Sequence, residues 1–261
     1  MHFCKILPMI EFNRVKLVLT AALFSILNIV NAAELKVAFV TEREPYCFKI
    51  NDVDSGIEID VIRAALKPFG YTIKPIIVPK ARLSLVLKSG DADISATIQG
   101  TDGDGLFFSD SYINFHNFVI SKKKKTVEIN GLSDIDKYSF IIWQGGWKNL
   151  GAQFEATYKP DATGKSRANY HEAHSQLNQS KMFWADRTDL IIVDRKIFEH
   201  FRTQLRKEFK TDEEVVYHDI LKAQTSYSTG FHNKELRDQF NEGLKKIRAD
   251  GTYQAILDSY Q

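Results

Sequence analysis

Residues 35–98 decide the fold class, and they begin with the apolar run Leu-Lys-Val-Ala-Phe-Val at positions 35–40. Behind it come an amphipathic stretch at 58–69, a β-branched run at 73–78, a short helical stretch at 81–89 and another apolar run at 92–98. Short β-branched runs that alternate with amphipathic stretches are typical of parallel strands joined by crossover helices. The sequence therefore predicts a βαβαβ unit and an α/β fold.

A second αβ pattern follows the extended segment at residues 112–121, which ends in four lysines at 122–125. Because four like charges fit poorly inside a domain, we expect a solvated linker there, at which the chain crosses between domains. The later segments are predicted as strands at 140–143, 190–193 and 214–218, as helices near 147–157, 171–180 and 195–207, and as terminal helices from about 236 to 260.

Residues 1–32 have the pattern of a secretory signal peptide. Arg14 and Lys16 precede an apolar run at 17–30, and small residues at the end of the segment predict cleavage after Ala32. The alternatives are a membrane anchor and a buried helix, but about 14 apolar residues are fewer than the roughly 20 that span a bilayer. We therefore predict a soluble protein that is exported to the periplasm.

Composition excludes several classes of protein. The chain has 261 residues, 35 of them Lys or Arg and 33 Asp or Glu, and this near-balance argues against nucleic-acid binding. Residues 1–32 contain three of the basic and one of the acidic residues, so the predicted mature chain is formally neutral. Of the two cysteines, only Cys47 remains after cleavage, which excludes an intramolecular disulfide.

Polar and aromatic residues follow the predicted strands at their carboxyl ends. Open α/β sheets bind ligands at this edge, because several loops and helix amino termini meet there. Residues from both αβ units suggest one cleft between them. Together with Arg82, which is discussed below, the predicted ligand-binding residues are Tyr46, Gln99, Trp143, Gly145, Trp147 and Asp194.

Each of these residues also has an ordinary structural explanation. Asp194 would either pair with a ligand cation or cap the helix that begins at Arg195. Gly145 would let backbone N–H groups approach an anion or simply form a strand-to-helix turn. The aromatic rings would line a pocket or belong to the core. The pattern alone leaves these alternatives open.

Catalytic and metal-binding motifs are poorly matched. In His171-Glu172-Ala173-His174 the histidines are three residues apart, which does not fit the zinc motif H-E-x-x-H. The segment at 102–105 (Asp-Gly-Asp-Gly) lacks the later ligands of a calcium loop. We predict neither a metal nor a cofactor, and no enzymatic activity. An enzyme would need a paired acid and base, for which the candidates are Glu42, Glu44 and Asp194.

Six motifs in order resemble the extracellular solute-binding protein family 3, the periplasmic polar amino acid-binding proteins of ABC transporters. They lie at residues 35–48, 56–61, 89–93, 108–112, 189–194 and 250–256. The resemblance implies the two-lobe periplasmic binding protein fold of type II, each lobe a mostly parallel sheet flanked by helices. It places lobe 1 at residues 33–120 and 225–261 and lobe 2 at 121–224.

The resemblance also assigns roles to single residues. Asp194 matches the carboxylate that holds the ligand ammonium, and Tyr46 matches an aromatic residue of the first ligand loop. The arginine that clamps the ligand carboxylate in this family is missing from the loop at 101–105. Pro79-Lys80-Ala81-Arg82 resembles the pattern P-W-x-R of a subgroup, so Arg82 is predicted to supply that charge, and Lys80 replaces an aromatic platform. Trp147 replaces a small hydroxyl residue.

The resemblance thus implies a periplasmic receptor that closes two lobes over a small polar, amino-acid-like or amine-bearing solute. Its partner would be the permease of an ABC transporter, and we expect a monomer. Two alternatives stay open: a sensory protein that reports to a membrane receptor, and a small periplasmic dehydratase.

Overall fold

The structure is a computed structural model that describes residues 1, 33–40, 43–221 and 224–260. The predicted signal peptide lies outside the described residues. Among the residues that are described, no helix is long and apolar enough to cross a membrane.

The βαβαβ unit predicted at the start of the chain is confirmed. Its strands are β1 (Ala33–Phe39), β4 (Tyr71–Ile77) and β5 (Ile94–Ile98), in the order β4-β1-β5, and β1 pairs in parallel with both neighbours. The connections contain α2 (Ile57–Leu66) with the 3-10 turn η1 (Lys67–Phe69), and η2 (Lys80–Arg82) with α3 (Leu83–Lys88). A small hairpin of β2 (Phe48–Ile50) and β3 (Val53–Ser55), which the sequence did not predict, precedes α2. We call this half lobe 1.

Lobe 2 repeats the architecture. Its parallel strands are β8 (Phe140–Trp143), β9 (Tyr170–Ala173) and β10 (Leu190–Asp194), in the order β10-β8-β9. The helices and turns are η3 (Lys123–Lys125), α4 (Leu132–Ile135), η4 (Gly146–Asn149), α5 (Ala152–Tyr158), α6 (Gln176–Trp184), α7 (Arg195–Gln204) and η5 (Leu205–Lys207). The short strand β11 (Val215–His218) pairs with β7, which is described next.

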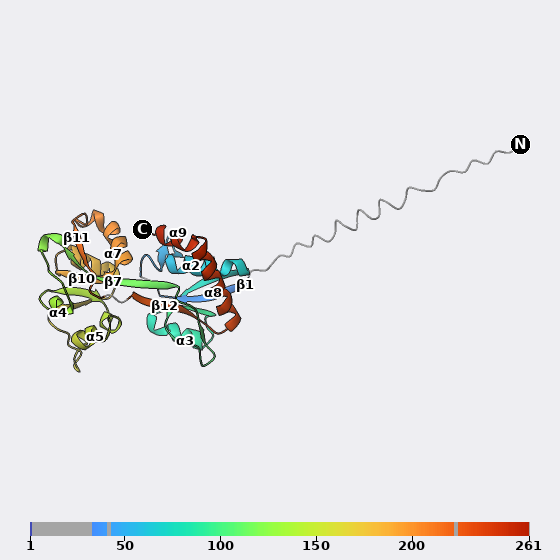
Figure 1. Ribbon diagram of the computed structural model, residues 1–261, viewed down its shortest axis with the longest axis horizontal. Helices are drawn as coiled ribbons and strands as arrows, with labels where there is room; N and C mark the ends of the chain where they lie inside the picture. Colours follow the sequence, from blue (N-terminus) through green and yellow to red (C-terminus); the bar gives the residue numbers. More distant parts are fainter. Residues whose placement is uncertain (2–32, 41–42, 222–223, 261) are drawn as a thin grey trace. The chain divides into compact units, whose positions relative to one another are not determined.

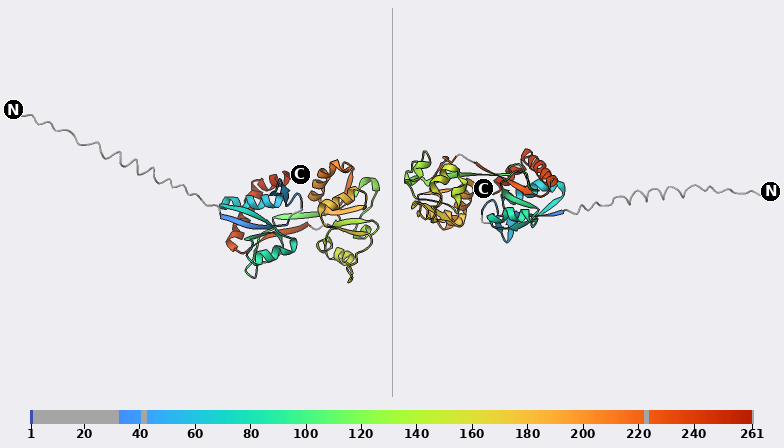
Figure 2. Two further views of the ribbon diagram at one scale, coloured as in Figure 1. Left: turned by 180° about the vertical axis from the view of Figure 1, so that it is seen from behind. Right: turned by 90° about the horizontal axis from the view of Figure 1, so that it is seen from below.

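Two long antiparallel strands connect the lobes. They are β7 (Ile113–Lys122) and β12 (Gln224–Phe231), which pair with each other through residues 113–116 of β7. From Asn117 onward β7 pairs with β10 of lobe 2, whereas β12 continues along β5 and the short strand β6 (Phe107–Phe108) of lobe 1. Figures 1 and 2 show both strands side by side between the two groups of elements. The lobe boundaries at residues 120 and 225 stay a prediction.

The chain ends in two helices that return to lobe 1, α8 (Lys234–Ala249) and α9 (Thr252–Asp258). Figure 1 shows α8 and α9 beside α2. A Cβ on Gly243 of α8 would lie 1.9 Å from the carbonyl oxygen of Ala65 in α2. The two helices can therefore approach this closely only because position 243 has no side chain.

Two predicted helices of lobe 2 need correction. Residues 171–180 were expected to form one helix, but 170–173 form β9, because Tyr170 and Ala173 are buried in a strand paired with β8. Helix α6 starts only after Ser175, whose hydroxyl accepts a hydrogen bond from the N–H of Asn178. The helix predicted at 147–157 is divided at Gly151, where φ is 93°.

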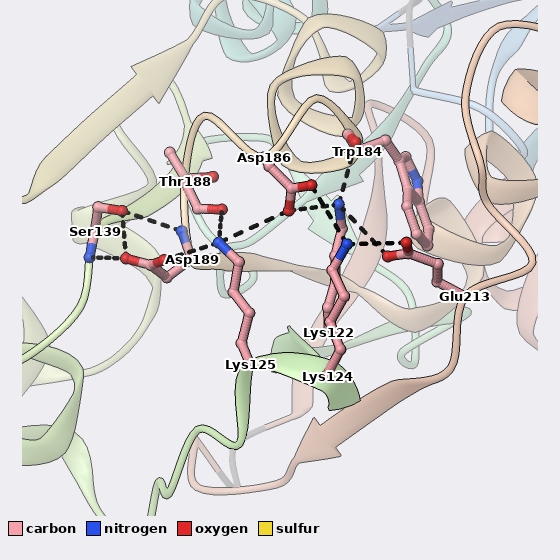
Figure 3. A network of polar contacts seen from close by, with 9 residues as sticks. All are labelled: Lys122, Lys124, Lys125, Ser139, Trp184, Asp186, Thr188, Asp189 and Glu213. Atoms are coloured by element: carbon pink, nitrogen blue, oxygen red, sulfur yellow. Dashed lines mark hydrogen bonds and ion pairs between the residues drawn. The ribbon is translucent and has the colours of Figure 1, made fainter.

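The expectation of a solvated linker at residues 122–125 is wrong for Lys122. This side chain is 2% exposed, and its ammonium donates to the carbonyl oxygen of Trp184 at 3.1 Å and to Asp186 at 2.8 Å. Lys124 pairs with Glu213 at 2.9 Å, and Lys125 pairs with Asp189 at 2.8 Å (Figure 3). Consecutive lysines are tolerated here because carboxylates from other segments of lobe 2 surround the end of β7 and pair with them.

Candidate functional site

A cleft with a volume of about 460 Å³ lies between the lobes, beside β7 and β12. Lobe 1 lines it with Val40, Arg43, Pro79 and Lys80, and the connecting strands contribute Phe115, Asn117, Thr225 and Tyr227. Lobe 2 lines it with Trp143, Gln144, Asn149, His174, Ser175, Gln176, Asp194 and Ile197. Most of the lobe residues stand at or just beyond the carboxyl ends of β1, β4, β8, β9 and β10, where an open α/β sheet binds its ligand.

Arg43 provides a cation on the lobe 1 wall. Its Nη2 donates to Glu58 Oε1 at 2.6 Å and to Thr97 Oγ1 at 3.3 Å, and its guanidinium lies 5.3 Å from the centre of the Phe115 ring. The Arg43 side chain is 16% exposed, whereas Glu58 in the first turn of α2 is fully buried. The buried Glu58 carboxylate therefore holds the Arg43 guanidinium from the protein interior, and Arg43 borders the cleft.

Lys80 adds a second cation next to Arg43. It begins the 3-10 turn after β4 and lines the cleft. Burial lowers the pKa of its ammonium, and the positive charges of Arg43 and Lys148 lower it further. Lys148 belongs to η4 of lobe 2 and is not among the residues that line the cleft.

Asp194 provides a carboxylate on the lobe 2 wall. It ends β10 and caps α7, because its Oδ1 accepts hydrogen bonds from the N–H groups of Lys196 at 2.9 Å and Ile197 at 3.2 Å. Its Oδ2 accepts from the N–H of His116 at 2.8 Å. The side chain is 3% exposed, and this burial raises the pKa of the carboxyl although the hydrogen bonds favour its ionised form. The helix-cap interpretation is thus confirmed, and a ligand contact would be additional.

Tyr46 does not line the cleft, but it contacts two residues that do: its ring lies 4.3 Å from that of Phe115, centre to centre, and its hydroxyl reaches Asp194. Its hydroxyl donates to Asp194 Oδ1 at 3.0 Å, which joins a loop of lobe 1 to lobe 2. The ring lines a second cavity of about 600 Å³ together with His116 and Phe118, whereas Phe115 and Asn117 of the same strand line the cleft. Because successive side chains of a strand point to opposite faces, the two cavities lie on opposite sides of β7.

The other predicted site residues are divided between the cleft and its surroundings. Trp143 lines the cleft. Gln99 is exposed, does not line the cleft and donates its amide to the carbonyl oxygen of Ser226 at 3.0 Å. Gly145, with φ of 68°, precedes η4 without lining the cleft.

Trp147 and Arg82 also lie outside the cleft lining. Trp147 packs against the core of lobe 2, and the ammonium groups of Lys148 and Lys159 lie 5.1 and 5.8 Å from the centre of its ring. Arg82 is exposed at the end of η2. The arginine in the cleft lining is Arg43, whereas the predicted Arg82 is not part of it.

Arg43 could have been found from the sequence, because it follows the first strand in the segment that also contains Tyr46. Two polar residues of the lining gave no signal in the sequence: Asn117 lies inside the long strand β7, and His174, just after β9, fell within a predicted helix. Glu42, a candidate acid or base, lies outside the described residues. Across the described part of the chain, no group of three or more potential ligands could hold a metal ion.

The sequence model of the bacterial extracellular solute-binding proteins, family 3, matches residues 35–261. The chain belongs to this family. The match covers all but the first two residues of the predicted mature chain, so the family resemblance is confirmed. No curated protein sequence matched the chain.

Several solved structures share the fold at low sequence identity. An ancestral arginine-binding protein bound to arginine is 20% identical, with a TM-score of 0.64 and coverage of 87% of this chain and 98% of that one. A histidine kinase sensor domain similar to periplasmic binding proteins is 18% identical, with a TM-score of 0.66 and coverage of 88% and 96%. An ancestral amino acid-binding protein, a precursor of cyclohexadienyl dehydratase, is 19% identical, with a TM-score of 0.65 and coverage of 87% and 95%. These likenesses confirm the α/β periplasmic binding protein fold.

Proposed function

We propose that this protein captures a small polar, amino-acid-like solute in the cleft between its lobes. The observation that carries the proposal is the separation of charge across the cleft. Arg43 and Lys80 stand on the lobe 1 wall, and Asp194 stands on the lobe 2 wall. A solute with a carboxylate at one end and an ammonium at the other complements this arrangement.

In this proposal Arg43 holds the ligand carboxylate. Its planar guanidinium can offer two parallel N–H donors, which a lysine cannot do, and Glu58 fixes its orientation. Asp194 receives the ammonium, and Trp143 covers the ligand from lobe 2. The neutral side chains of Asn117 and Gln144 satisfy the remaining polar atoms of the ligand.

The mechanism is a population shift. The ligand contacts both walls only when the lobes are closed, and it favours the closed state by this difference in affinity. The lobes turn about β7 and β12, whose pairing with each other links them. Closure then presents a surface that a membrane partner recognises.

The membrane partner we propose is the permease of an ABC transporter, with the protein acting as a monomer in the periplasm. Its membership of the extracellular solute-binding family supports this. The likeness to a histidine kinase sensor domain favours a sensory partner as the second candidate. Uptake of the radiolabelled ligand by cells that lack the gene distinguishes the two: loss of uptake indicates transport, and unchanged uptake indicates sensing.

Binding without turnover is the expected behaviour. Asp194 has its Oδ1 occupied by three donors, so it is poorly suited to move a proton. The likeness to a dehydratase precursor makes a turnover assay of every ligand worthwhile. Product formed at a rate proportional to protein concentration would replace the binding proposal by an enzymatic one.

A thermal-shift screen of amino acids, polyamines, peptides and organic acids tests the proposal directly. A ligand at about a hundred times its Kd stabilises the protein by roughly 2.7 kcal/mol. At roughly 2–4 °C per kcal/mol for a protein of this size, the melting temperature rises by about 5–11 °C. Absence of any shift across all four classes would contradict the proposed function.

A further inference from the structure

A second cavity lies behind the hinge, on the opposite side of β7 from the cleft. It has a volume of about 600 Å³, and both lobes line it, with Tyr46 and Tyr260 from lobe 1 and the first two turns of α7 from lobe 2. Phe118 of β7 faces this cavity, whereas its neighbour Asn117 faces the cleft. In Figure 1, α7 and α9 lie on one side of β7, and α3 and α5 lie on the other. We call this space the rear cavity.

Two contacts cross between the lobes at the rear cavity. The Tyr46 hydroxyl of lobe 1 donates to Asp194 Oδ1 of lobe 2 at 3.0 Å. The ring of Phe48, at the start of β2 in lobe 1, meets the ring of His200 in α7 edge to face, with 5.7 Å between the ring centres. Tyr260 packs against the same Phe48 ring at 6.1 Å and thus supports it from within lobe 1. We call the Tyr46–Asp194 and Phe48–His200 pairs the rear contacts.

The position of the hinge couples the rear contacts to the cleft. The lobes are joined through β7 and β12, and rotation about these strands is the proposed closing movement. Because β7 lies between the cleft and the rear cavity, a rotation that brings the walls of the cleft together moves the walls of the rear cavity apart. Closing of the lobes therefore acts against the rear contacts.

We propose that the rear contacts favour the open state of the unliganded protein and thereby set the affinity of the cleft for its ligand. This inference rests on the proposed function, because it concerns the closing movement of the same two lobes. Part of the binding free energy of the ligand is used to separate the rear contacts, so the apparent affinity is lower than that of the closed state. Loss of a rear contact should strengthen binding, although neither Phe48 nor His200 lines the cleft.

Distances between the lobes test the rear contacts without any ligand. Spin labels at Lys88→Cys, the end of α3 in lobe 1, and at Lys159→Cys, just after α5 in lobe 2, report the opening of the cleft. Both positions are exposed, and the native Cys47 is buried. We expect Phe48→Leu and His200→Ala each to enlarge the population with a short label distance, measured by double electron–electron resonance. Unchanged distance distributions in both variants would overturn the inference.

Calorimetry tests the same effect through binding. L-arginine and L-glutamine serve as probes, because each carries the carboxylate and the ammonium that complement the charges of the cleft. For a probe that binds, Phe48→Leu and His200→Ala should each lower the dissociation constant roughly two- to tenfold, since an aromatic contact of this kind no longer opposes closing. Weaker or unchanged binding in both variants would contradict the proposal.

Three further variants show whether the effect belongs to the rear contacts. Phe69→Leu is the matched control, because it makes the same substitution in lobe 1, where the Phe69 ring meets Lys246 of the same lobe. It should change neither the distances nor the affinity. The double variant Phe48→Leu/His200→Ala should match the single variants, because each of them already removes the ring contact. Tyr46→Phe, which removes the hydrogen bond to Asp194, should also shorten the label distance.

The results separate this inference from the proposed function. An equal effect of Phe69→Leu, or additive effects of Phe48→Leu and His200→Ala, would show that the two rings do not act on each other across the lobes and would overturn the inference. Binding of a probe would then leave the proposed function standing. If neither probe binds, the label distances decide on the rear contacts, and failure of the proposed function appears separately, as the absence of any ligand in the broad thermal screen.

Discussion

At the scale of single residues, Asp194 has two tasks that a substitution can separate. Its carboxylate caps α7 and accepts the hydroxyl of Tyr46, and it is also the proposed partner of the ligand ammonium. Burial raises the pKa of Asp194 above that of a free aspartate, so ionisation of this carboxyl costs more in the folded protein than in the unfolded chain. The contribution of Asp194 to the free energy of unfolding therefore declines as the pH rises from the pKa of this carboxyl in the unfolded chain to its higher pKa in the folded protein. A bound ammonium would offset this loss.

Asp194→Asn should weaken binding of an amine-bearing ligand by about ten- to a hundredfold while the protein stays folded. Asparagine caps a helix about as well as aspartate, whereas the lost charge-assisted bond is worth roughly 1.5–3 kcal/mol. Calorimetry with the ligand from the screen measures the affinity, and circular dichroism checks the fold. An unchanged affinity would mean that Asp194 caps α7 but does not bind the ligand ammonium.

Arg43 and Arg82 are competing candidates for the carboxylate clamp, and the structure favours Arg43. Arg43→Met should lose most of the affinity for a carboxylate ligand, whereas Arg82→Ala should retain it. The single Arg43 variant leaves Glu58 buried without its cation, which costs roughly 3–5 kcal/mol of stability.

The double variant Arg43→Met/Glu58→Gln removes both charges, so it tests the loss of the arginine without leaving a buried unpaired carboxylate. Affinities for the ligand and for its decarboxylated analogue, measured side by side, decide between the two arginines. If Arg82→Ala lost more affinity for the carboxylate ligand than Arg43→Met, Arg82 would be the carboxylate clamp.

At the scale of secondary-structure elements, β7 depends on a lysine that the sequence marks as solvent-exposed. Lys122 ends this strand and lies buried among Trp184, Asp186 and Glu213 (Figure 3). The ring faces of Phe183 and Trp184 lie 5.5 and 5.4 Å from its ammonium. The buried lysine thus adds to the pairing with β10 and β11 that holds β7 in lobe 2.

Lys122→Met should lower the free energy of unfolding by about 2–3 kcal/mol, because it removes charge-assisted hydrogen bonds to Trp184 and Asp186 at a buried position. Lys124→Met is the matched control. Its side chain is 52% exposed, and an exposed ion pair contributes roughly 0–1 kcal/mol. Urea unfolding of both variants measures the difference. Equal losses would mean that the burial of Lys122 adds nothing to the strength of its contacts.

At the scale of the whole molecule, the order of strands and helices in lobe 1 and most of lobe 2 could be predicted from local pattern. The positions of β1, β8 and β10 follow from short apolar runs, which are buried at Val37–Phe39 of β1 and along nearly all of β8 and β10. Strand β9 could not be predicted, because Tyr-His-Glu-Ala carries no clear period of its own and becomes a strand only beside β8. Strand β12 was missed for a similar reason, since its polar residues are held by β5 and β7.

The sequence by itself determined the family, the α/β class and the region of the site, because these depend on the order of motifs and on the rule that ligands bind at the carboxyl ends of strands. Only the tertiary structure decided which side chains meet. Arg43 rather than Arg82 lines the cleft, Tyr46 contacts it through Phe115 and Asp194, and Lys80 lines it together with Asp194 of the other lobe. Such contacts join residues tens of positions apart, and their geometry depends on how two lobes pack along shared strands, which no local pattern records.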